Sequence, residues 1–292
     1  MSTAPMATRD DDVHPATQAG TTRRRLVRSG IVVGCILYVA VLLIVPLIGI
    51  VYTAVKPGLS TIVETFQRED VRHAFYLTAI ITFWTVLVTT VLGVITAWVL
   101  VRQRFRGRAL LNALVDLPFA LSPVTVGLAA VLLFGPSGWL FDFFNARGIE
   151  ILFAMPSMVL VTIFICIPFT IREVVPVLEE IGVDEEDASR TLGASVWQTF
   201  FRVTIPNIRW GLLYGVALTI ARSIGEIGAV LLVSGLIKGQ TETATLFIFT
   251  AVEERLETQA YVVALSLAAV SIVLLVVIEA SRRHVEGRKS RT

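Results

Sequence analysis

The sequence predicts an all-α polytopic membrane protein that crosses the bilayer six times. Hydrophobic residues make up 55% of its 292 residues and charged residues only 16%. Several apolar runs exceed the roughly 20 residues that a helix needs to cross the hydrocarbon core. The three histidines are scattered, and Cys35 and Cys166 have no metal-ligand neighbours. The sequence therefore indicates neither a metal site nor a disulfide framework.

The N-terminal region predicts a tail followed by the first span. Residues 1–29 are expected to form a disordered cytoplasmic tail, because most of this stretch is polar and aperiodic. Arg28 and an arginine triplet at 23–25 then precede an apolar run at 31–55. This run is too long for the apolar core of a signal peptide and lacks a small-residue cleavage site. We therefore expect it to remain as the first membrane span.

Five further apolar runs complete a predicted six-helix transmembrane domain over residues 30–281. They lie at residues 74–101, 110–134, 151–175, 208–233 and 261–280. A basic tail, 282–292, follows the last one.

Charge predicts the orientation of these spans. Eighteen Lys and Arg residues lie in the two tails and in the connections 102–108 and 172–209, whereas the connections on the opposite side hold six. Short cytoplasmic segments of membrane proteins carry the excess of positive charge. Both termini and the connection 172–209 are therefore expected in the cytoplasm.

A polar segment at 184–206, DEEDASRTLGASVWQTFFRVTIP, interrupts the apolar pattern between the fourth and fifth spans. Asp184 and the acidic residues after it predict a helix start, because carboxylates suit the positive end of a helix. Gly193 predicts a break, and a second short run at 195–202 is expected to stop before Pro206. The pattern indicates a helix–turn–helix at the membrane surface. An amphipathic interfacial loop without a partner is the alternative.

The spacing of this segment resembles the cytoplasmic signature loop of importer-type ABC permeases. The family has Glu-Ala-Ala, three residues, Gly, nine residues, and then Ile-x-Leu-Pro. The matching positions here are Asp187, Ala188, Ser189, Gly193, Val203, Ile205 and Pro206. The resemblance implies that the segment is the coupling-helix loop of a type I importer, which docks into a groove of the ATPase subunit.

Almost the whole stretch from 30 to 280 resembles permease subunits of bacterial sulfate/thiosulfate ABC importers. The resemblance is carried by residues 116–124 (DLPFALSPV), 169–178 (FTIREVVPVL), 205–216 (IPNIRWGLLYGV) and 222–230 (RSIGEIGAV). The triplet at 122–124 is more similar to the W-type than to the T-type subunit of that permease pair. The phrase at 222–230 is shared with molybdate and tungstate permeases, which leaves the larger oxyanions as an alternative substrate.

The resemblance also implies partners and a compartment. The complete importer would contain a W-type and a T-type permease, two copies of an ATP-binding subunit and an external sulfate-binding protein, in the bacterial plasma membrane. ATP-Mg would bind the partner ATPase subunits, because this chain lacks the GxxxxGK[ST] phosphate loop. No cofactor is expected in the chain itself. The basic C-terminal tail suits anionic lipid head groups, and no nucleic-acid module is visible.

Two charged residues lie where lipid makes charge costly. Arg222 and Glu226 are four apart in the fifth span, so they would share a helix face and could pair. At about 1.5 Å per residue, Arg222 lies roughly 20 Å from Ile208 along the helix. A charge at such a depth marks a functional site by default. The pair is either part of an anion path or a structural ion pair.

The third span carries a second candidate for the translocation path. Pro118 and Pro123 remove backbone donors, and Ser122 and Thr125 add hydroxyl groups. Broken helices in membranes occur where the freed backbone groups line a cavity or are buried in protein. The alternative is a kinked helix that is merely packed.

Glycines recur through the fifth span and its flank. Small residues at such spacings allow helices to approach closely. We expect a packing role for Gly211, Gly215, Gly225, Gly228 and Gly235.

Two other protein classes compete with the importer subunit. A secondary anion transporter or channel would need no coupling loop and would often contain an internal repeat, which is not evident here. A membrane-embedded enzyme would need His, Asp or Cys residues clustered at one membrane face, and the sequence shows no such cluster.

Overall fold

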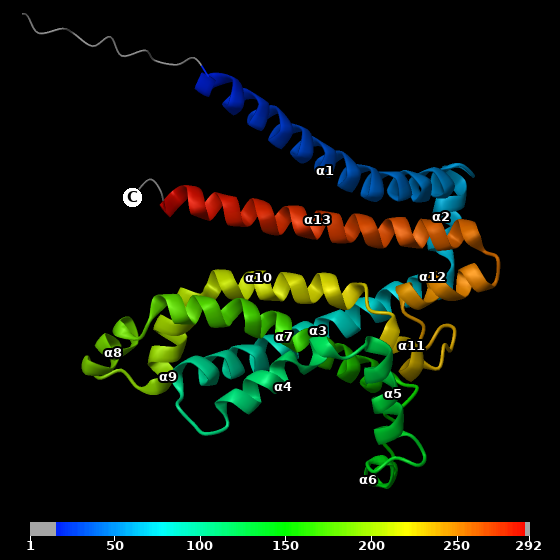
Figure 1. The fold of residues 1–292 in the computed structure, drawn as a ribbon. Coiled ribbons are helices and arrows are strands. Elements are labelled where there is room, and N and C mark those ends of the chain that lie inside the picture. The colour runs from blue at the N-terminus through cyan, green and yellow to red at the C-terminus, as the bar shows by residue number, and fades with distance from the viewer. Residues whose placement is uncertain (1–15, 290–292) are drawn as a thin grey trace, which may run out of the picture. The chain divides into compact units, whose positions relative to one another are not determined.

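The computed structural model describes residues 16–289 as a succession of helices, without a strand in that range (Figure 1). Side chains at 16–28, 275, 278, 279 and 281–289 are outside this description. The chain divides into two compact units, Met1–Tyr52 and Thr53–Thr292. Each unit is described on its own.

The first unit contains most of helix α1, Ala16–Val55. Its part from Ser29 to Val55 has a mean hydropathy of 3.1 and is long enough to cross a membrane. Apolar side chains lie all round it and are exposed, as suits a helix surrounded by lipid. Helix α1 begins at Ala16, inside the segment 1–29 for which we expect a tail, and the extent of that tail stays a prediction. Residues 1–15 of that predicted tail are outside the described residues.

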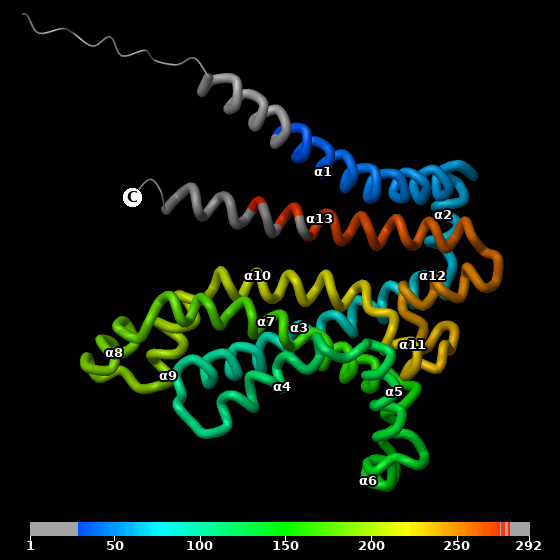
Figure 2. Tube along the Cα trace, in the orientation of Figure 1, coloured from blue at the N-terminus to red at the C-terminus, as the bar shows by residue number. Residues whose placement is uncertain are grey.

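The second unit contains the other helices, which Figure 2 traces along the chain. They are α2 Leu59–Gln67, α3 Glu69–Arg102, α4 Arg108–Ala120, α5 Pro123–Phe134, α6 Phe141–Asn145, α7 Met155–Ile181, α8 Asp184–Thr191, α9 Val196–Thr199, a π-helix Phe200–Thr204, α10 Ile205–Ile224, α11 Gly228–Ser234, α12 Ala244–Glu253 and α13 Glu257–Lys289.

The described chain contains four helices long and apolar enough to span a membrane, and six if each of two bent helix pairs forms one span. The predicted all-α polytopic fold is therefore confirmed. The third span, for which the sequence left a broken or a merely kinked helix open, is a bent pair of helices, and so is the fifth span, for which we expected one helix. Helices α4 and α5 are bent by 108° at their junction, and α10 and α11 by 54°.

The two breaks differ in their local signals. Pro123 at the start of α5 lacks a backbone donor, and the residue before it, Ser122, is extended with φ −65° and ψ 139°. In the fifth span, α10 ends at Ile224 and α11 begins at Gly228, with Gly225 as the cap of α10. Gly225 has φ −90° and ψ 7°, a conformation open to any residue, so the break does not depend on glycine at this position.

Helices α3, α7 and α10 form the centre of the second unit and run alongside one another (Figure 1). Glycines permit this contact. A Cβ at Gly215 would lie 2.9 Å from Cα of Thr170, and one at Gly211 would lie 2.8 Å from the carbonyl oxygen of Glu173. The predicted packing role of these two glycines is confirmed, since any side chain would push α10 away from α7.

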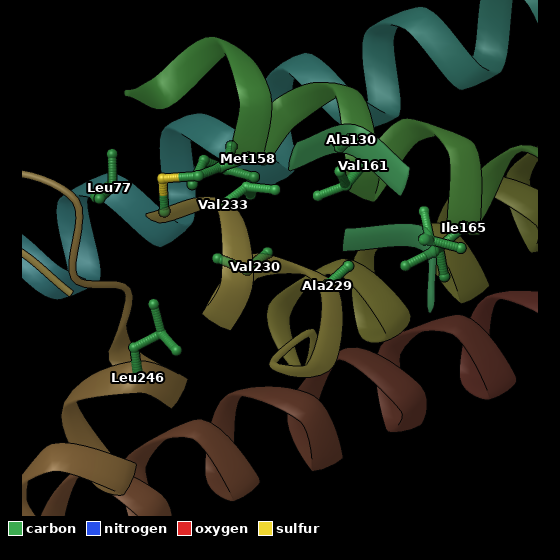
Figure 3. Packing of buried hydrophobic residues seen from close by; sticks show 11 residues of the cluster. Leu77, Ala130, Met158, Val161, Ile165, Ala229, Val230, Val233 and Leu246 are labelled. Carbon is green, nitrogen blue, oxygen red and sulfur yellow. The ribbon is translucent and has the colours of Figure 1, made fainter. Parts of the chain in front are cut away.

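Buried apolar side chains form clusters at different levels of this bundle. The cluster in Figure 3 joins α3, α5, α7, α11 and α12 through Leu77, Ile81, Val126, Ala130, Met158, Val161, Ile165, Ala229, Val230, Val233 and Leu246. A second cluster joins α3, α4, α7 and α10 nearer to α8 and α9, through Val94, Ala97, Leu100, Val115, Ile171, Val174, Leu178 and Ile208. Figure 1 shows α8 and α9 at the end of the bundle opposite α11 and α12.

Candidate functional site

The polar segment 184–206 folds as two short helices separated by a turn, as the sequence predicted. Helix α8 begins at Asp184, and the turn contains Gly193 at φ 87°, a left-handed conformation that favours glycine. Helix α9 begins after Ser195, which forms a capping box with Gln198. Asp184 is the first helical residue rather than the cap, which is Val183. The carboxylate of Asp184 therefore stabilises α8 through its favourable interaction with the helix dipole and not through a capping hydrogen bond.

The second half of the segment differs from the prediction at Pro206. The chain stays helical from α9 through a π-helical turn, Phe200–Thr204, into α10. Pro206 is therefore in the first turn of α10, where its missing N–H breaks no hydrogen bond of that helix. The predicted helix end before Pro206 is therefore wrong. The chain remains helical on both sides of this residue, and a proline is tolerated in the first turn of a helix.

The turn and α9 expose large apolar side chains. Leu192 is 89% exposed and Trp197 71% exposed, and Val196 and Phe201 are also exposed. The rings of Trp197 and Phe201 stack with centroids 6.0 Å apart. We call Leu192, Val196, Trp197 and Phe201 the loop patch. Exposed apolar groups of this size on a polar segment mark an interaction surface.

The residues of the predicted signature differ in their environments. Asp187 and Ala188 are exposed on α8, and the carboxylate of Asp187 lies 3.6 Å from Arg190. Ser189 is half-buried, with its hydroxyl 3.1 Å from that of Thr199 on α9. Val203 and Ile205 are half-buried, and Pro206 is exposed. The signature thus includes both surface residues and residues that hold the turn together.

A buried ion pair that sequence reasoning missed attaches this segment to the membrane helices. The Nε atom of Arg102, at the end of α3, donates to both carboxylate oxygens of Glu186 on α8, each at 3.2 Å. The hydroxyl of Thr204 donates to the same carboxylate at 3.0 Å. The side chains of Arg102 and Glu186 are only 8% and 5% exposed. The two residues are 84 positions apart, so no local pattern pointed to their contact.

The predicted pair Arg222–Glu226 is present, with 2.6 Å between Nη1 of Arg222 and Oε2 of Glu226. The prediction that both lie on one helix is wrong, because α10 ends at Ile224 and Glu226 occupies the break before α11. The side chain of Arg222 is 31% exposed, whereas that of Glu226 is 2% exposed. The carboxylate is thus enclosed by protein and the guanidinium is partly open.

Backbone contacts hold Glu226 in the break. Its other oxygen, Oε1, accepts a 2.9 Å hydrogen bond from the backbone N–H of Ala229 in the first turn of α11. Its backbone carbonyl accepts from the hydroxyl of Thr245 at 2.8 Å. Glu226 therefore connects α10, α11 and α12, and its negative charge lies where the N-terminus of α11 favours it.

The breaks of the third and fifth spans lie side by side. A Cβ at Gly228 would lie 2.9 Å from Cβ of Pro123 and 3.7 Å from Oε1 of Glu226. The predicted path residues Ser122 and Thr125 flank Pro123 and are both exposed. The structure thus brings together two interruptions that are about 100 residues apart in sequence. It also explains Gly228, since any side chain there would separate α5 from α11.

Hydroxyl groups line the contacts of α10 near Arg222. The hydroxyl of Ser223 donates to that of Thr82 on α3 at 3.2 Å, and the hydroxyls of Thr219 and Thr170 on α7 lie 3.3 Å apart. Sequence reasoning did not select Thr82 or Thr170. Threonine is common in such helices, and only the fold brings these residues to α10.

Asp116 accepts two hydrogen bonds from Arg172, at 2.9 and 2.5 Å, and so ties α4 to α7. Among the described residues, no group of three or more His, Cys, Asp or Glu side chains could hold a metal ion.

Comparison with known proteins identifies the family. Residues 89–291 match the family described as binding-protein-dependent transport system inner membrane component. The chain belongs to this family, and it is a membrane protein with several spans.

Individual relatives narrow the match. The chain is 45% identical over 242 residues to the sulfate transport system permease protein CysW of Synechocystis sp. The match covers 83% of this chain and 88% of that protein. It is 48% identical over 202 residues to CysW of Escherichia coli, covering 69% of each. The sulfate transport system permease protein CysT of E. coli is 36% identical over 240 residues, and the match covers 82% of this chain and 87% of that protein.

A solved structure supports the fold. A chain of a bacterial alginate ABC transporter, crystallised in complex with an alginate-bound periplasmic protein, superposes with a TM-score of 0.76. The match covers 92% of this chain and 98% of that chain at 18% identity. The likeness shows that the present chain has the fold of an ABC importer permease.

Proposed function

We propose that this chain is the W-type permease subunit of an ATP-driven importer that moves sulfate, and with it thiosulfate, into the cell. The observation that carries the proposal is its identity of 44–48% to CysW proteins over most of its length. Identity to the CysT proteins is lower, 33–36%. This difference supports the W-type rather than the T-type position in the permease pair.

The partners follow from this position. A T-type permease pairs with the chain in the bacterial inner membrane, two copies of an ATP-binding subunit lie at its cytoplasmic side, and an external sulfate-binding protein delivers the anion. The alginate transporter crystallised with its periplasmic protein supports the last of these partners. ATP-Mg binds to the partner ATPases, and this chain contributes transport rather than hydrolysis.

The segment 184–206 is the coupling loop in this proposal. Its loop patch presents Trp197 and Leu192 to solvent, and the basic residues around it favour the cytoplasmic side. An apolar patch on a rigid turn suits insertion into a groove of an ATPase subunit. Closure of the ATPases on binding ATP then displaces the loop, and the permease pair changes from inward-open to outward-open.

Arg222 is the residue of this chain that meets the anion. Its guanidinium is partly open, and Glu226 neutralises part of its charge. A cation with a built-in counter-ion binds an anion weakly enough to release it, which transport requires. The hydroxyls of Ser122 and Thr125, on the adjacent break, are available as further hydrogen-bond donors.

The test is ATP-dependent uptake of labelled sulfate into vesicles containing this chain, its ATPase, the T-type subunit and the binding protein. We expect uptake that unlabelled thiosulfate blocks and molybdate leaves unchanged. Uptake blocked mainly by molybdate would move the substrate to the larger oxyanions while keeping the permease. Uptake that continues without ATP would contradict the proposal and favour a secondary transporter.

A further inference from the structure

We propose that Arg102 and Glu186 form the mechanical link through which a displacement of the coupling loop reaches helix α3. Both are then positioning residues for the ATP-driven cycle, although neither contacts nucleotide or anion. This inference rests on the proposed function, because it assumes that segment 184–206 is displaced by an ATPase.

The guanidinium of Arg102 joins three segments at one point. Its Nε binds the carboxylate of Glu186, its Nη1 donates to the carbonyl of Leu178 at 3.1 Å, and its Nη2 donates to the carbonyl of Gly182 at 2.5 Å. Leu178 lies in the last turn of α7, and Gly182 caps that helix. A planar guanidinium holds its partners in fixed directions. The ends of α3 and α7 and the first turn of α8 therefore form one rigid corner.

A second contact joins α3 to the other half of the loop. Trp98, one turn before Arg102, packs edge-on against Phe200 of the π-helix, with ring centroids 6.3 Å apart. The hydroxyl of Thr204 in the same π-helix binds Glu186. The last turn of α3 thus holds both halves of the coupling loop, so the loop cannot tilt without moving α3 or breaking these contacts.

Helix α3 leads from this corner to the region of Arg222. Thr82 of α3 accepts the hydroxyl hydrogen bond from Ser223, the neighbour of Arg222. Twenty residues separate Thr82 from Arg102, which corresponds to about 30 Å along a continuous helix. A displacement of the loop can therefore be carried by one rigid element to the side of α10 that holds the partly open cation.

A pair with a merely structural role would behave differently. Replacing a buried ion pair by neutral groups of similar shape is often tolerated by a fold. Apolar contacts at the same place would also hold the fold, but they would allow the helices to slide. Charge-assisted bonds resist sliding because they are directional. The proposal therefore predicts loss of coupling in a variant that still assembles.

The first test uses Glu186→Gln, which keeps the shape of the side chain and removes its charge. Because the guanidinium of Arg102 is left buried without its counter-ion, we expect a lowered unfolding temperature and a reduced yield of complex. In the complex that does assemble, we expect ATP hydrolysis within about two-fold of wild type and sulfate uptake per ATP reduced about ten-fold or more. Glu180→Gln is the matched control, because Glu180 is an exposed carboxylate at the end of α7. An unchanged ratio of uptake to hydrolysis in Glu186→Gln would overturn the proposal.

Arg102→Lys supplies a second variant if Glu186→Gln does not assemble. Lysine keeps the positive charge but cannot reproduce the fork of hydrogen bonds. We expect its uptake per ATP to lie between the values for wild type and for a fully uncoupled importer. A wild-type ratio in an assembled Arg102→Lys complex would count against the link.

The second test does not depend on the transported anion. Spin labels at Ile95 on α3 and at Thr191 on α8, both exposed and both outside the loop patch, report the distance between the two elements. Cys35→Ser removes the exposed native cysteine. We expect the same distance with and without ATP in otherwise wild-type complex, and a shifted or broadened distance in Glu186→Gln. If the distance between the labels in the otherwise wild-type complex changed by several ångströms on addition of ATP, the link would be refuted. If that distance stayed constant but the complex took up no sulfate, only the proposed substrate would be refuted.

Discussion

The ion pair at the coupling loop and the ion pair in the fifth span use the same chemistry in opposite surroundings. At the loop, Arg102 and Glu186 are both enclosed, and the guanidinium is hydrogen-bonded through Nε, Nη1 and Nη2. In the fifth span, Glu226 is enclosed, whereas Arg222 is partly open. An enclosed pair with satisfied donors can only hold its neighbours. A half-open pair can exchange its partner, which is what an anion path requires.

The largest effect should come from removing the cation of the enclosed pair. Arg102→Ala leaves the carboxylate of Glu186 buried without its counter-ion, and such a change costs about 3–5 kcal/mol. We expect a strongly lowered unfolding temperature and little assembled complex, measured by thermal unfolding and size-exclusion chromatography in detergent.

Arg104→Ala is the control for this experiment. Arg104 is exposed two residues further along the same connection, so its removal changes the net charge equally. We expect a change within about 0.5 kcal/mol, as for most surface substitutions. Equal behaviour of the two variants would contradict the contrast between an enclosed and an open cation.

The half-open pair should separate stability from transport. The double variant Arg222→Gln with Glu226→Gln removes both charges and leaves no unpaired buried carboxylate. We expect assembled complex with stability within about 1–2 kcal/mol of wild type. Sulfate uptake should fall about ten-fold or more, because the cation that attracts the anion is gone.

Arg209→Gln provides the matched control, since Arg209 is an exposed arginine near the start of the same helix, α10. Its uptake should stay near that of wild type. If the doubly neutral variant transported sulfate normally, Arg222 and Glu226 would be a structural pair and the path would lie elsewhere.

The contrast between the pairs also shows what the sequence could reveal. Arg222 and Glu226 were found because their spacing of four and their apolar surroundings are local signals. The coupling loop was recognisable because Gly193 and the polar residues around it interrupt an apolar pattern. Arg102, by contrast, is one of several arginines after a span and contributes to the charge asymmetry like the others. Its partner Glu186 is brought to it only by the packing of α3 against α7.

The sequence predicted the number of membrane spans better than it predicted their shapes. Apolar length predicts a crossing, because lipid demands about 20 such residues. The break at Pro123 had a local signal, but the bend of 108° is set by the contact of α5 with α11, where Gly228 meets Pro123. The break at Glu226 had only glycines as a signal, and glycine also serves close packing, as Gly211 and Gly215 do. Local residues therefore permit a break, and distant residues determine its angle.

Glu242 extends the comparison as a buried carboxylate that, among the residues 16–289 whose side chains are described, forms no ion pair. Glu242, between α11 and α12, is 1% exposed and accepts a hydrogen bond from the hydroxyl of Thr250. Its second oxygen, Oε2, is buried and has no hydrogen-bond partner within the described part of the chain. Burial raises the pKa of Glu242, while the hydrogen bond from Thr250 and the charge of Lys238 act in the opposite direction. The negative charges of Asp70 and Glu254 add to the rise.

This carboxyl should give the smallest of the three effects, visible as a dependence of stability on pH. Because its pKa is raised in the folded state, Glu242 contributes most stability below its unfolded pKa of about 4.5 and loses that contribution as the pH rises through the folded pKa. We therefore expect the unfolding temperature of wild type, relative to Glu242→Gln, to decrease from pH 4.5 to pH 8. The exposed neighbour Glu253→Gln should show no such trend against wild type. A relative stability that rose with pH would mean that Glu242 is stabilised as an anion, in which case the charge of Lys238 would outweigh burial and Glu242 would belong with the paired carboxylates Glu186 and Glu226.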